Sequence, residues 1–280
     1  MDKILVSTAL ISYNQEEFVK RTLSGILSQK LNGRHEVVCG DDTSTDNTGL
    51  IIEDFASDLR VRVLESESNL GMHGNWARTI EACDGKYIAI CEGDDVWIDP
   101  EKLQKQIDLL ERNPSASACF ANANIIDNEG KIGEYPYVVE PYSILDAKDF
   151  FALNYNPIPT CTLVFRNDAF SGFPKEYYNS PFADWILHTL LIQYGPYVYL
   201  PEFTSSYRQH SGGVWTGIAE EKQLINKLKA IEIIRSIISE EYLNQVVEAY
   251  KKQLDKLLYF YRDRKKWGNY LSTWIKLKIA

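Results

Sequence analysis

Long apolar runs are missing from this 280-residue sequence. No stretch approaches the roughly eighteen uncharged apolar residues that a membrane-spanning helix requires. The first residues, MDKILVSTALISYNQEEF, also lack the charged, then apolar, then small-residue order of a signal peptide. We therefore expect a chain without a spanning helix and without a secretory leader.

Cysteine is scarce, and its spacing forms no motif. The five cysteines include no CxxC pair, and they are Cys39, Cys83, Cys91, Cys119 and Cys161. An odd number of cysteines, mostly within apolar runs, is typical of reduced thiols in the core of a cytosolic protein. We therefore expect a cytoplasmic location.

Positive charge is in deficit. The sequence has 30 Lys and Arg against 39 Asp and Glu, which gives a net charge of −9 and an isoelectric point near 5.1. A nucleic-acid partner held by bulk charge is therefore excluded. The hydrophobic share of 45% also excludes a chain that is disordered throughout.

Glycine and proline nearly disappear from the last part of the chain. Pro201 is the last proline, and only Gly268 follows Gly217. The patterns LINKLKAIEIIRSII and YLNQVVEAYKKQLDKLLYFY in this part have helical spacing. We therefore predict one domain over residues 1–215 and a helical C-terminal extension over residues 216–280.

The end of the extension combines cations with large apolar side chains. Residues 251–280 hold nine basic and two acidic residues, a net charge of +7. Trp267, Leu271 and Trp274 recur at helical spacing, and Lys278 follows on the same stripe. This composition is typical of a helix that lies on a membrane surface. It also fits a terminal helix packed on the main domain or in a homodimer, and both interpretations stay open.

The first part of the sequence alternates between strand and helix patterns, which predicts a parallel sheet covered by helices on both faces. Apolar, β-branched runs indicate strands at 4–12, 35–40, 61–66 and 86–93. Amphipathic patterns indicate helices at 16–29, 47–57, 74–83 and 99–113. In sheets of this kind, ligands bind beyond the carboxyl ends of the strands.

Polar and mostly acidic residues follow three of the expected strands. They are Ser12-Tyr13-Asn14, then Asp41-Asp42-Thr43-Ser44-Thr45-Asp46, then Glu92-Gly93-Asp94-Asp95. Carboxylates repel one another unless a cation or hydrogen-bond donors compensate. One or two carboxylates together with a diphosphate can complete the coordination of Mg²⁺ or Mn²⁺. The Asp94-Asp95 pair therefore predicts a divalent-cation site at this edge of the sheet.

Two common nucleotide-binding motifs are missing. The sequence has no GxxxxGK[ST] loop, which disfavours an ordinary NTPase, and no GxGxxG after the first strand, which disfavours a dinucleotide-binding domain.

Taken together, three stretches resemble the family 2 glycosyltransferases, whose fold is the GT-A type. These stretches are VSTALISYNQEEFVKRTLSGILSQ, HEVVCGDDTSTDNT and SNLGMHGNWARTIEACDGKYIAICEGDD. The continuation EGDDVWIDPEKLQKQIDLLERNP is similar to the members that build bacterial surface polysaccharides. The resemblance covers residues 4–130 well and about 155–215 loosely. It implies a Rossmann-like, mostly parallel sheet and a nucleotide-sugar donor.

The resemblance also implies roles for single residues at the donor site. Tyr13 would stack on the nucleotide base, and Asp42 would accept a hydrogen bond from the imide of that base, which favours uracil. Asp94 would lie near the ribose, and Asp95 would ligate Mn²⁺ or Mg²⁺.

Asn69 and Arg78 match the N-x-G…A-R stretch of the family, which implies that they also belong to the nucleotide-sugar site. Arg78 would face the diphosphate or the acidic cluster. An ion pair on the surface of its helix is the alternative interpretation.

Two further residues come from the second half of the sequence. Asp184, in SPFADWILHTLLIQYG, fits the family's catalytic base, and capping of the helix that follows is the alternative. His210, in SYRQHSGGVW, matches a Y-R-x-H stretch, which implies a further metal ligand. The reaction implied is an inverting, metal-dependent transfer from a UDP-sugar to a hydroxyl of a glycan or lipid-linked acceptor.

Three other functions stay open on the sequence alone. A sugar-1-phosphate nucleotidyltransferase shares the fold and the metal chemistry, but it needs a Gly-rich loop with a basic residue where this chain has SYNQEE. A non-catalytic, sugar-nucleotide-binding assembly subunit and a retaining transferase are the other two.

Overall fold

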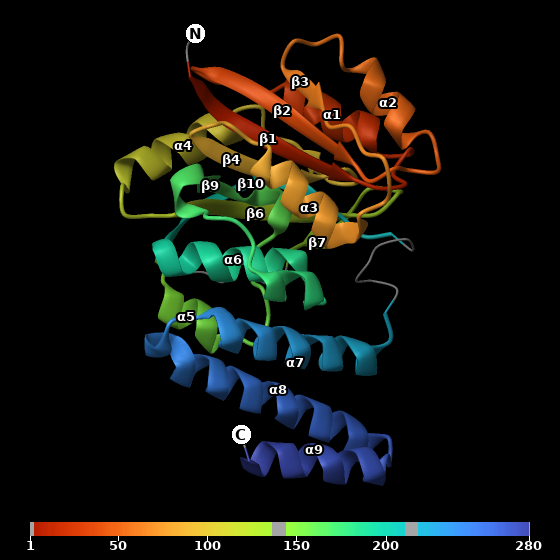
Figure 1. Ribbon diagram of the computed structural model, residues 1–280, viewed down its shortest axis with the longest axis vertical. Helices are drawn as coiled ribbons and strands as arrows, with labels where there is room; N and C mark the ends of the chain where they lie inside the picture. The colour runs from red at the N-terminus through yellow and green to blue at the C-terminus, as the bar shows by residue number, and fades with distance from the viewer. Residues whose placement is uncertain (1–2, 136–143, 211–217, 280) are drawn as a thin grey trace. The chain divides into compact units, whose positions relative to one another are not determined.

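The computed structural model describes residues 3–135, 144–210 and 218–279 (Figure 1). The chain forms two compact units. The first consists of Met1–Leu145, Pro157–Phe173 and Tyr194–Gln209, and the second of Asp146–Asn156, Pro174–Gln193 and His210–Ala280. The boundary predicted between residues 215 and 216 lies outside the described residues.

A single sheet forms the first unit. Within the described residues its strands follow the order β3-β2-β1-β4-β9-β6-β10-β5, with β7 paired to β6 and β8 to β10. The strands are β1 (Ile4–Ser12), β2 (Arg34–Asp41), β3 (Val61–Val63), β4 (Tyr87–Glu92), β5 (Val96–Trp97), β6 (Ala118–Ile126), β7 (Lys131–Glu134), β8 (Ile144–Leu145), β9 (Val164–Arg166) and β10 (Tyr197–Arg208).

The half of the sheet formed by β3, β2, β1 and β4 is parallel, as the alternating pattern predicts. Ile11 of β1 lies opposite Gly40 of β2 on one side and opposite Glu92 of β4 on the other. Because the three strands run in the same direction and in this register, they end at the same edge. The residues after Ser12, Asp41 and Glu92 are therefore neighbours.

The other half of the sheet is mixed. β6 and β10 are parallel, but β9 runs antiparallel between β4 and β6, and β5, β7 and β8 also pair antiparallel. Sequence periodicity indicates which face of a strand is buried, but it does not indicate which strand lies beside it. The pairing in this half of the sheet could therefore not be predicted from the sequence pattern.

Each helix described in the first unit buries one of its faces. They are α1 (Val19–Leu27), α2 (Thr48–Asp54), α3 (Gly71–Glu81) and α4 (Lys102–Arg112). Two short turns, η1 (Thr160–Thr162) and η2 (Asn167–Ala169), lie before and after β9. In α1 the buried side chains are Val19, Thr22, Leu23 and Ile26. Burying each of the three aliphatic side chains stabilises the fold by about 1.5–3 kcal/mol. This gain exceeds the smaller free-energy cost of placing a β-branched residue in a helix.

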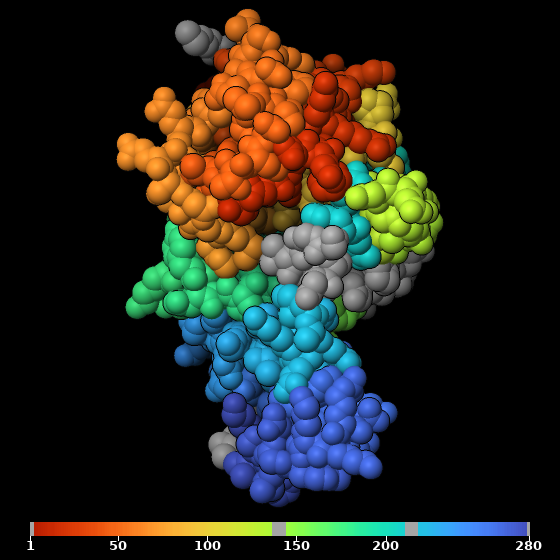
Figure 2. Space-filling view, turned by 90° about the vertical axis from the view of Figure 1, so that its right-hand side faces the viewer, coloured from red at the N-terminus to blue at the C-terminus, as the bar shows by residue number. Residues whose placement is uncertain are grey.

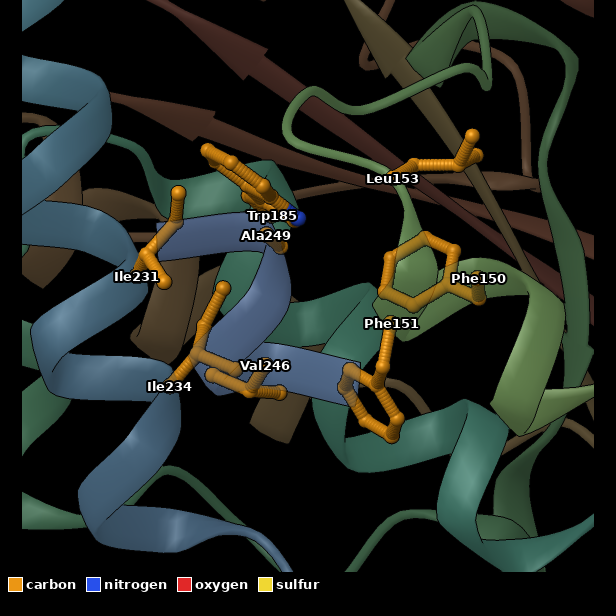
Figure 3. A pocket seen from close by; sticks show the side chains of 8 residues that line it. All are labelled: Phe150, Phe151, Leu153, Trp185, Ile231, Ile234, Val246 and Ala249. Carbon is orange, nitrogen blue, oxygen red and sulfur yellow. The ribbon is translucent and has the colours of Figure 1, made fainter. Parts of the chain in front are cut away.

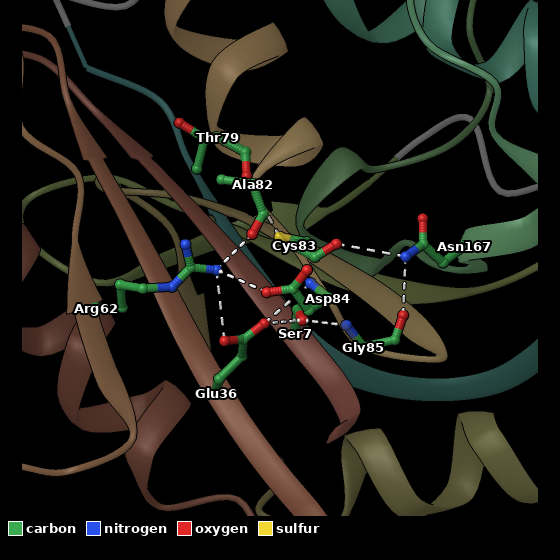
Figure 4. A network of polar contacts seen from close by, with 9 residues as sticks. All are labelled: Ser7, Glu36, Arg62, Thr79, Ala82, Cys83, Asp84, Gly85 and Asn167. Atoms are coloured by element: carbon green, nitrogen blue, oxygen red, sulfur yellow. Dashed lines mark hydrogen bonds and ion pairs between the residues drawn. The ribbon is translucent and has the colours of Figure 1, made fainter. Parts of the chain in front are cut away.

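A polar network joins β1, β2 and β3 to the residues just before β4 (Figure 4). The Ser7 hydroxyl donates to Glu36 and accepts a 2.7 Å hydrogen bond from the Gly85 amide. The Arg62 guanidinium lies 3.5 Å from carboxylate oxygens of both Glu36 and Asp84. These contacts set the register of the two strands whose far ends carry Tyr13 and Asp95.

Helices make up most of the second unit. They are α5 (Ala147–Ala152), α6 (Ala183–Tyr194), α7 (Glu220–Ile237), α8 (Leu243–Asp263) and α9 (Trp267–Ile279), with the turns η3 (Lys175–Asn179) and η4 (Glu240–Tyr242). A small apolar cavity lies among α5 to α8 (Figure 3), and its lining is Phe150, Phe151, Leu153, Trp185, Ile231, Ile234, Val246 and Ala249. We interpret it as a packing gap, since all of its lining side chains are aliphatic or aromatic.

Within the described residues, no helix combines the length and apolar character that crossing a bilayer requires.

Candidate functional site

The loops at the carboxyl edge of the sheet are tied to one another. Figure 2 turns the right-hand side of Figure 1 toward the viewer, and there red residues from the start of the chain lie beside the cyan residues that end β10. Asn14 adopts a left-handed backbone with φ of 52°. Its side-chain oxygen accepts a 2.8 Å hydrogen bond from the Thr45 amide, and its own amide donates to Ser44 Oγ at 2.9 Å. Tyr13, which precedes Asn14, is 47% exposed, so its ring is accessible to a ligand.

Asp42 and Asn69 are brought into direct contact. The Asn69 side-chain amide donates to the Asp42 carbonyl at 2.8 Å, and Asp42 Oδ1 accepts from the Leu70 amide at 2.7 Å. Asp42 is buried, and its own amide donates to the Ser12 carbonyl at 3.0 Å. One Asp42 oxygen therefore anchors the start of α3. Recognition of a base by Asp42 stays a prediction.

Arg78 of α3 reaches the main chain of the loops. Its guanidinium donates to the carbonyls of Asp41 at 2.5 Å and Glu65 at 2.9 Å, and to Asn75 Oδ1 at 2.9 Å. None of these three acceptors is a carboxylate. The contacts hold the loop that carries Asp42, and a role toward a diphosphate stays a prediction.

The Asp94–Asp95 turn is held from α1. The Thr22 hydroxyl lies 2.8 Å from the Gly93 carbonyl and 2.7 Å from the Asp95 carbonyl. A Cβ at position 93 would lie 2.3 Å from Gln15 Oε1 and 3.0 Å from the Cβ of Ser12, so a side chain there would displace that of Gln15. Close packing around Gly93 therefore keeps the two aspartates in one tight turn.

The Asp95 carboxylate is buried, with only 1% of the residue exposed. Oδ1 accepts a 2.8 Å hydrogen bond from the Arg208 amide, whereas Oδ2 has no hydrogen-bond partner within the described residues. Burial raises the pKa of Asp95 well above its usual value, and the nearby charge of Asp94 raises it further. The Arg208 hydrogen bond, the neighbouring Cys161 thiol and the Arg208 charge offset this only in part.

The donor set fits a divalent cation that is shared with a ligand. A buried carboxylate with an unbound oxygen is stabilised by a cation. In the part of the chain that the structure describes, no group of three or more His, Cys, Asp or Glu side chains is arranged to hold a metal. Mg²⁺ sites in proteins usually have one or two carboxylates, with phosphate oxygens and water as the other ligands.

Arg208, at the end of β10, is a site residue that our sequence reasoning missed. Its amide binds Asp95, and its Nε donates to the Asp94 carbonyl at 2.9 Å. The only signal was its place in the stretch SYRQHSGGVW, where we singled out His210 instead.

Two predicted residues belong to the second unit. Asp184 lies in the first turn of α6, partly buried, and its Oδ2 accepts a 2.8 Å hydrogen bond from the Asn156 side-chain amide. His210 is partly buried in the same unit. The other six predicted residues lie in the first unit. Asn156 carried no sequence signal that we recognised.

The model of the family described as glycosyl transferase family 2 matches residues 7–171. This stretch is more than half of the chain and contains the three polar loops that follow β1, β2 and β4. The chain belongs to glycosyl transferase family 2.

Several proteins are similar to this chain in sequence. The uncharacterized protein Rv1520 of Mycobacterium tuberculosis is 36% identical over 217 residues, which is 75% of this chain and 60% of that protein. The Escherichia coli UDP-Glc:alpha-D-GlcNAc-diphosphoundecaprenol beta-1,3-glucosyltransferase WfgD is 34% identical over 135 residues, 48% of this chain and 52% of WfgD. The chain thus spans about half to 60% of the length of these relatives.

Solved structures show the fold of this glycosyl transferase family 2 chain. S. aureus TarS 1-349 in complex with UDP-GlcNAc superimposes with a TM-score of 0.65 at 15% identity, covering 96% of this chain and 90% of TarS. The expected GT-A fold, a central sheet flanked by helices and followed by C-terminal helices, is confirmed.

Proposed function

We propose that this family 2 chain transfers a sugar from a UDP-sugar to a hydroxyl of a glycan or lipid-linked acceptor in bacterial surface polysaccharide synthesis. The observation that carries the proposal is the buried Asp95 carboxylate, whose Oδ2 has no partner in the described residues, at the edge that also carries Tyr13 and Asp42. Two similar proteins support a UDP-sugar donor: the name of WfgD includes UDP-Glc, and the TarS structure contains UDP-GlcNAc.

The chain's own residues would bind the base, the ribose and the diphosphate of the donor. The exposed ring of Tyr13 stacks on the base, Asp42 accepts from the base imide, and Asp94 lies near the ribose. Asn69 and Arg78 hold the loop that carries Asp42, and in this proposal they also contact the donor. Asp95 and His210 are the groups that would hold Mn²⁺ or Mg²⁺, which supplies positive charge to the departing diphosphate.

Asp184 is the general base in this proposal, and the reaction inverts the anomeric centre. Its carboxylate takes the proton of the acceptor hydroxyl as that oxygen attacks the face opposite the leaving diphosphate. The N-terminus of α6 favours the ionised form of the carboxylate. The Asn156 amide binds one of its oxygens and so fixes the orientation in which the carboxylate meets the acceptor.

A thermal-shift panel of UDP-, GDP-, CDP- and dTDP-sugars, each with and without Mn²⁺, tests the donor. We expect stabilisation by UDP-sugars that depends on the metal, because ligands that bind the folded state raise its stability. If only a GDP-, CDP- or dTDP-sugar stabilises the protein, the donor carries that nucleotide in place of UDP. If no nucleotide sugar stabilises the protein, the proposal is contradicted.

The rival functions have different signatures in the same protein. A non-catalytic assembly subunit would bind the UDP-sugar without ever releasing UDP when acceptors are supplied. A nucleotidyltransferase would form a sugar nucleotide and pyrophosphate from UTP and a sugar 1-phosphate. A retaining transferase would leave the anomeric configuration of the product unchanged.

We further propose that the protein works as a peripheral protein on the inner face of the cell membrane, docked through residues 251–280. Helix α9 supports this: Trp267, Leu271, Trp274 and Ile275 are between 43% and 59% exposed. They follow helical spacing on one face, whereas Tyr270 and Leu277 pack onto the core formed with α8. Nearby Lys278 lies 5.7 Å above the Trp274 ring. Such a face suits an anionic bilayer.

Flotation with vesicles of phosphatidylglycerol and phosphatidylcholine tests the docking. The Trp267→Ser/Trp274→Ser protein should float less than wild type, and salt should weaken flotation of both. Leu59→Ser is the matched control, since Leu59 is an exposed apolar residue of the first unit. Equal flotation would contradict the proposal, and a loss of dimer in the double variant would indicate the homodimer instead.

A further inference from the structure

The Arg208 side chain is buried, with 7% of the residue exposed, and it bridges two separate segments. Nε donates to the Asp94 carbonyl and Nη1 donates to the Asp127 carbonyl, each at 2.9 Å. The guanidinium also lies over the Phe18 ring, with its carbon 4.5 Å from the ring centroid. A planar, always-charged head group is suited to such a fixed fork of contacts.

These contacts determine where the amide of residue 208 lies, and that amide is the donor to Asp95 Oδ1. The carboxylate is therefore held from one side by Arg208, while Thr22 holds the main chain of the same turn. With Oδ1 engaged, Oδ2 is the oxygen left for another partner, and it has none within the described residues.

We propose that Arg208 is a positioning residue that holds the Asp95 carboxylate in the orientation in which Oδ2 can receive a divalent cation. The inference rests on the proposed function, because it assumes that Asp95 acts toward such a cation. Arg208 itself acts through its contacts with Asp94, Asp127 and Phe18 and touches no reacting atom.

The first unit contains a matched arginine outside this site. Arg166 donates to the carbonyls of Ala116 at 2.9 Å and Leu110 at 2.6 Å, and its guanidinium lies 5.5 Å from the Tyr87 ring centroid. Both arginines thus bridge two carbonyls and lie over a ring. Replacing either with Lys keeps the charge but loses the fork, because one ammonium group cannot reproduce its geometry.

The experiment compares Arg208→Lys with Arg166→Lys in the full chain. Melting temperatures are measured first, and UDP affinity is then measured by calorimetry over a range of Mn²⁺ concentrations, at a temperature where every protein is folded. We expect both variants to melt earlier than wild type. We expect only Arg208→Lys to weaken UDP binding in Mn²⁺, by about 10-fold or more, with UDP binding in EDTA unchanged.

Each other outcome overturns the inference. If Arg208→Lys binds UDP with the Mn²⁺ dependence of wild type, or if Arg166→Lys shows the same loss, Arg208 is only structural. If the UDP affinity of the wild-type protein does not depend on Mn²⁺, both the proposed function and this inference are wrong.

A milder variant covers the case in which Arg208→Lys does not fold. Phe18→Leu removes the ring beneath the guanidinium and keeps every hydrogen bond of Arg208. It should weaken UDP binding in Mn²⁺ by about 2–5-fold, and an unchanged affinity would overturn the inference.

Discussion

The side-chain amide of Asn156 and the carboxylate of Asp184, 28 residues apart in the sequence, are joined by a 2.8 Å hydrogen bond. The bond orients a carboxylate in the first turn of α6, where the helix dipole favours the ionised form. An oriented and partly buried carboxylate is suited to accept a proton from a hydroxyl group.

Replacing Asp184 with Asn should remove the general base and keep the donor site. We expect the turnover number to fall by about 10²–10⁴-fold, because general-base help is usually of that size, while UDP affinity stays normal. Steady-state assays of UDP release and calorimetry with UDP measure the two effects.

Asp149→Asn is the matched control for Asp184, because Asp149 also lies in the first turn of a helix of the second unit, α5. It should keep wild-type turnover. Wild-type turnover in Asp184→Asn would remove the assignment of the base.

Replacing Asp95 with Asn should stabilise the protein in EDTA and abolish the effect of Mn²⁺ on UDP binding. Burial raises the pKa of Asp95, which means that the ionised side chain costs free energy in the folded state. Removing that cost should raise the free energy of unfolding by about 1–3 kcal/mol, as measured by urea titration. Asp108→Asn on α4 is the control, and a Mn²⁺-dependent shift that survives in Asp95→Asn would contradict the role of Asp95.

Replacing Gly40 with Ala should push α3 away from β2. A Cβ at position 40 would lie 1.9 Å from Thr79 Oγ1 and 2.9 Å from Asn75 Oδ1. We expect a loss of about 1–3 kcal/mol in the free energy of unfolding and weaker UDP binding, since α3 carries Arg78. Adding Thr79→Ala should restore part of both, and a double-mutant cycle without coupling would refute the packing argument.

Stability should fall in mildly acidic solution because of His35. Burial, followed by the charge of Arg60, lowers the pKa of His35 to about 4, although Asp58 opposes this. The unfolded chain therefore binds more protons than the folded chain below pH 6.5, and stability is lost as the pH falls from 6.5 toward 4. From pH 7 to pH 5, this one group should cost about 2 kcal/mol.

His35→Gln is the matched variant for this effect, because it can keep the 2.8 Å contact between His35 Nε2 and Thr8 Oγ1 but does not titrate. Its free energy of unfolding should depend less on pH between 7 and 5 than that of wild type. Identical pH dependence in urea titrations would show that other groups cause the loss.

The order of elements in the first half and the polar residues after β1, β2 and β4 could be predicted from the sequence. Strand and helix periods are local, and parallel strands that alternate with helices end at one edge. These two facts were enough to predict that Tyr13, Asp42 and Asp95 lie in neighbouring loops.

Local pattern did not predict the mixed half of the sheet or the contacts that orient the site residues. The bond from Asn156 to Asp184 and the contacts of Arg208 with Asp94, Asp95 and Asp127 join residues distant in the chain. Sequence alone determined which side chains stand at the ends of the parallel strands. Tertiary structure decided which of their oxygens are engaged, because a hydrogen bond depends on where two distant segments meet in space.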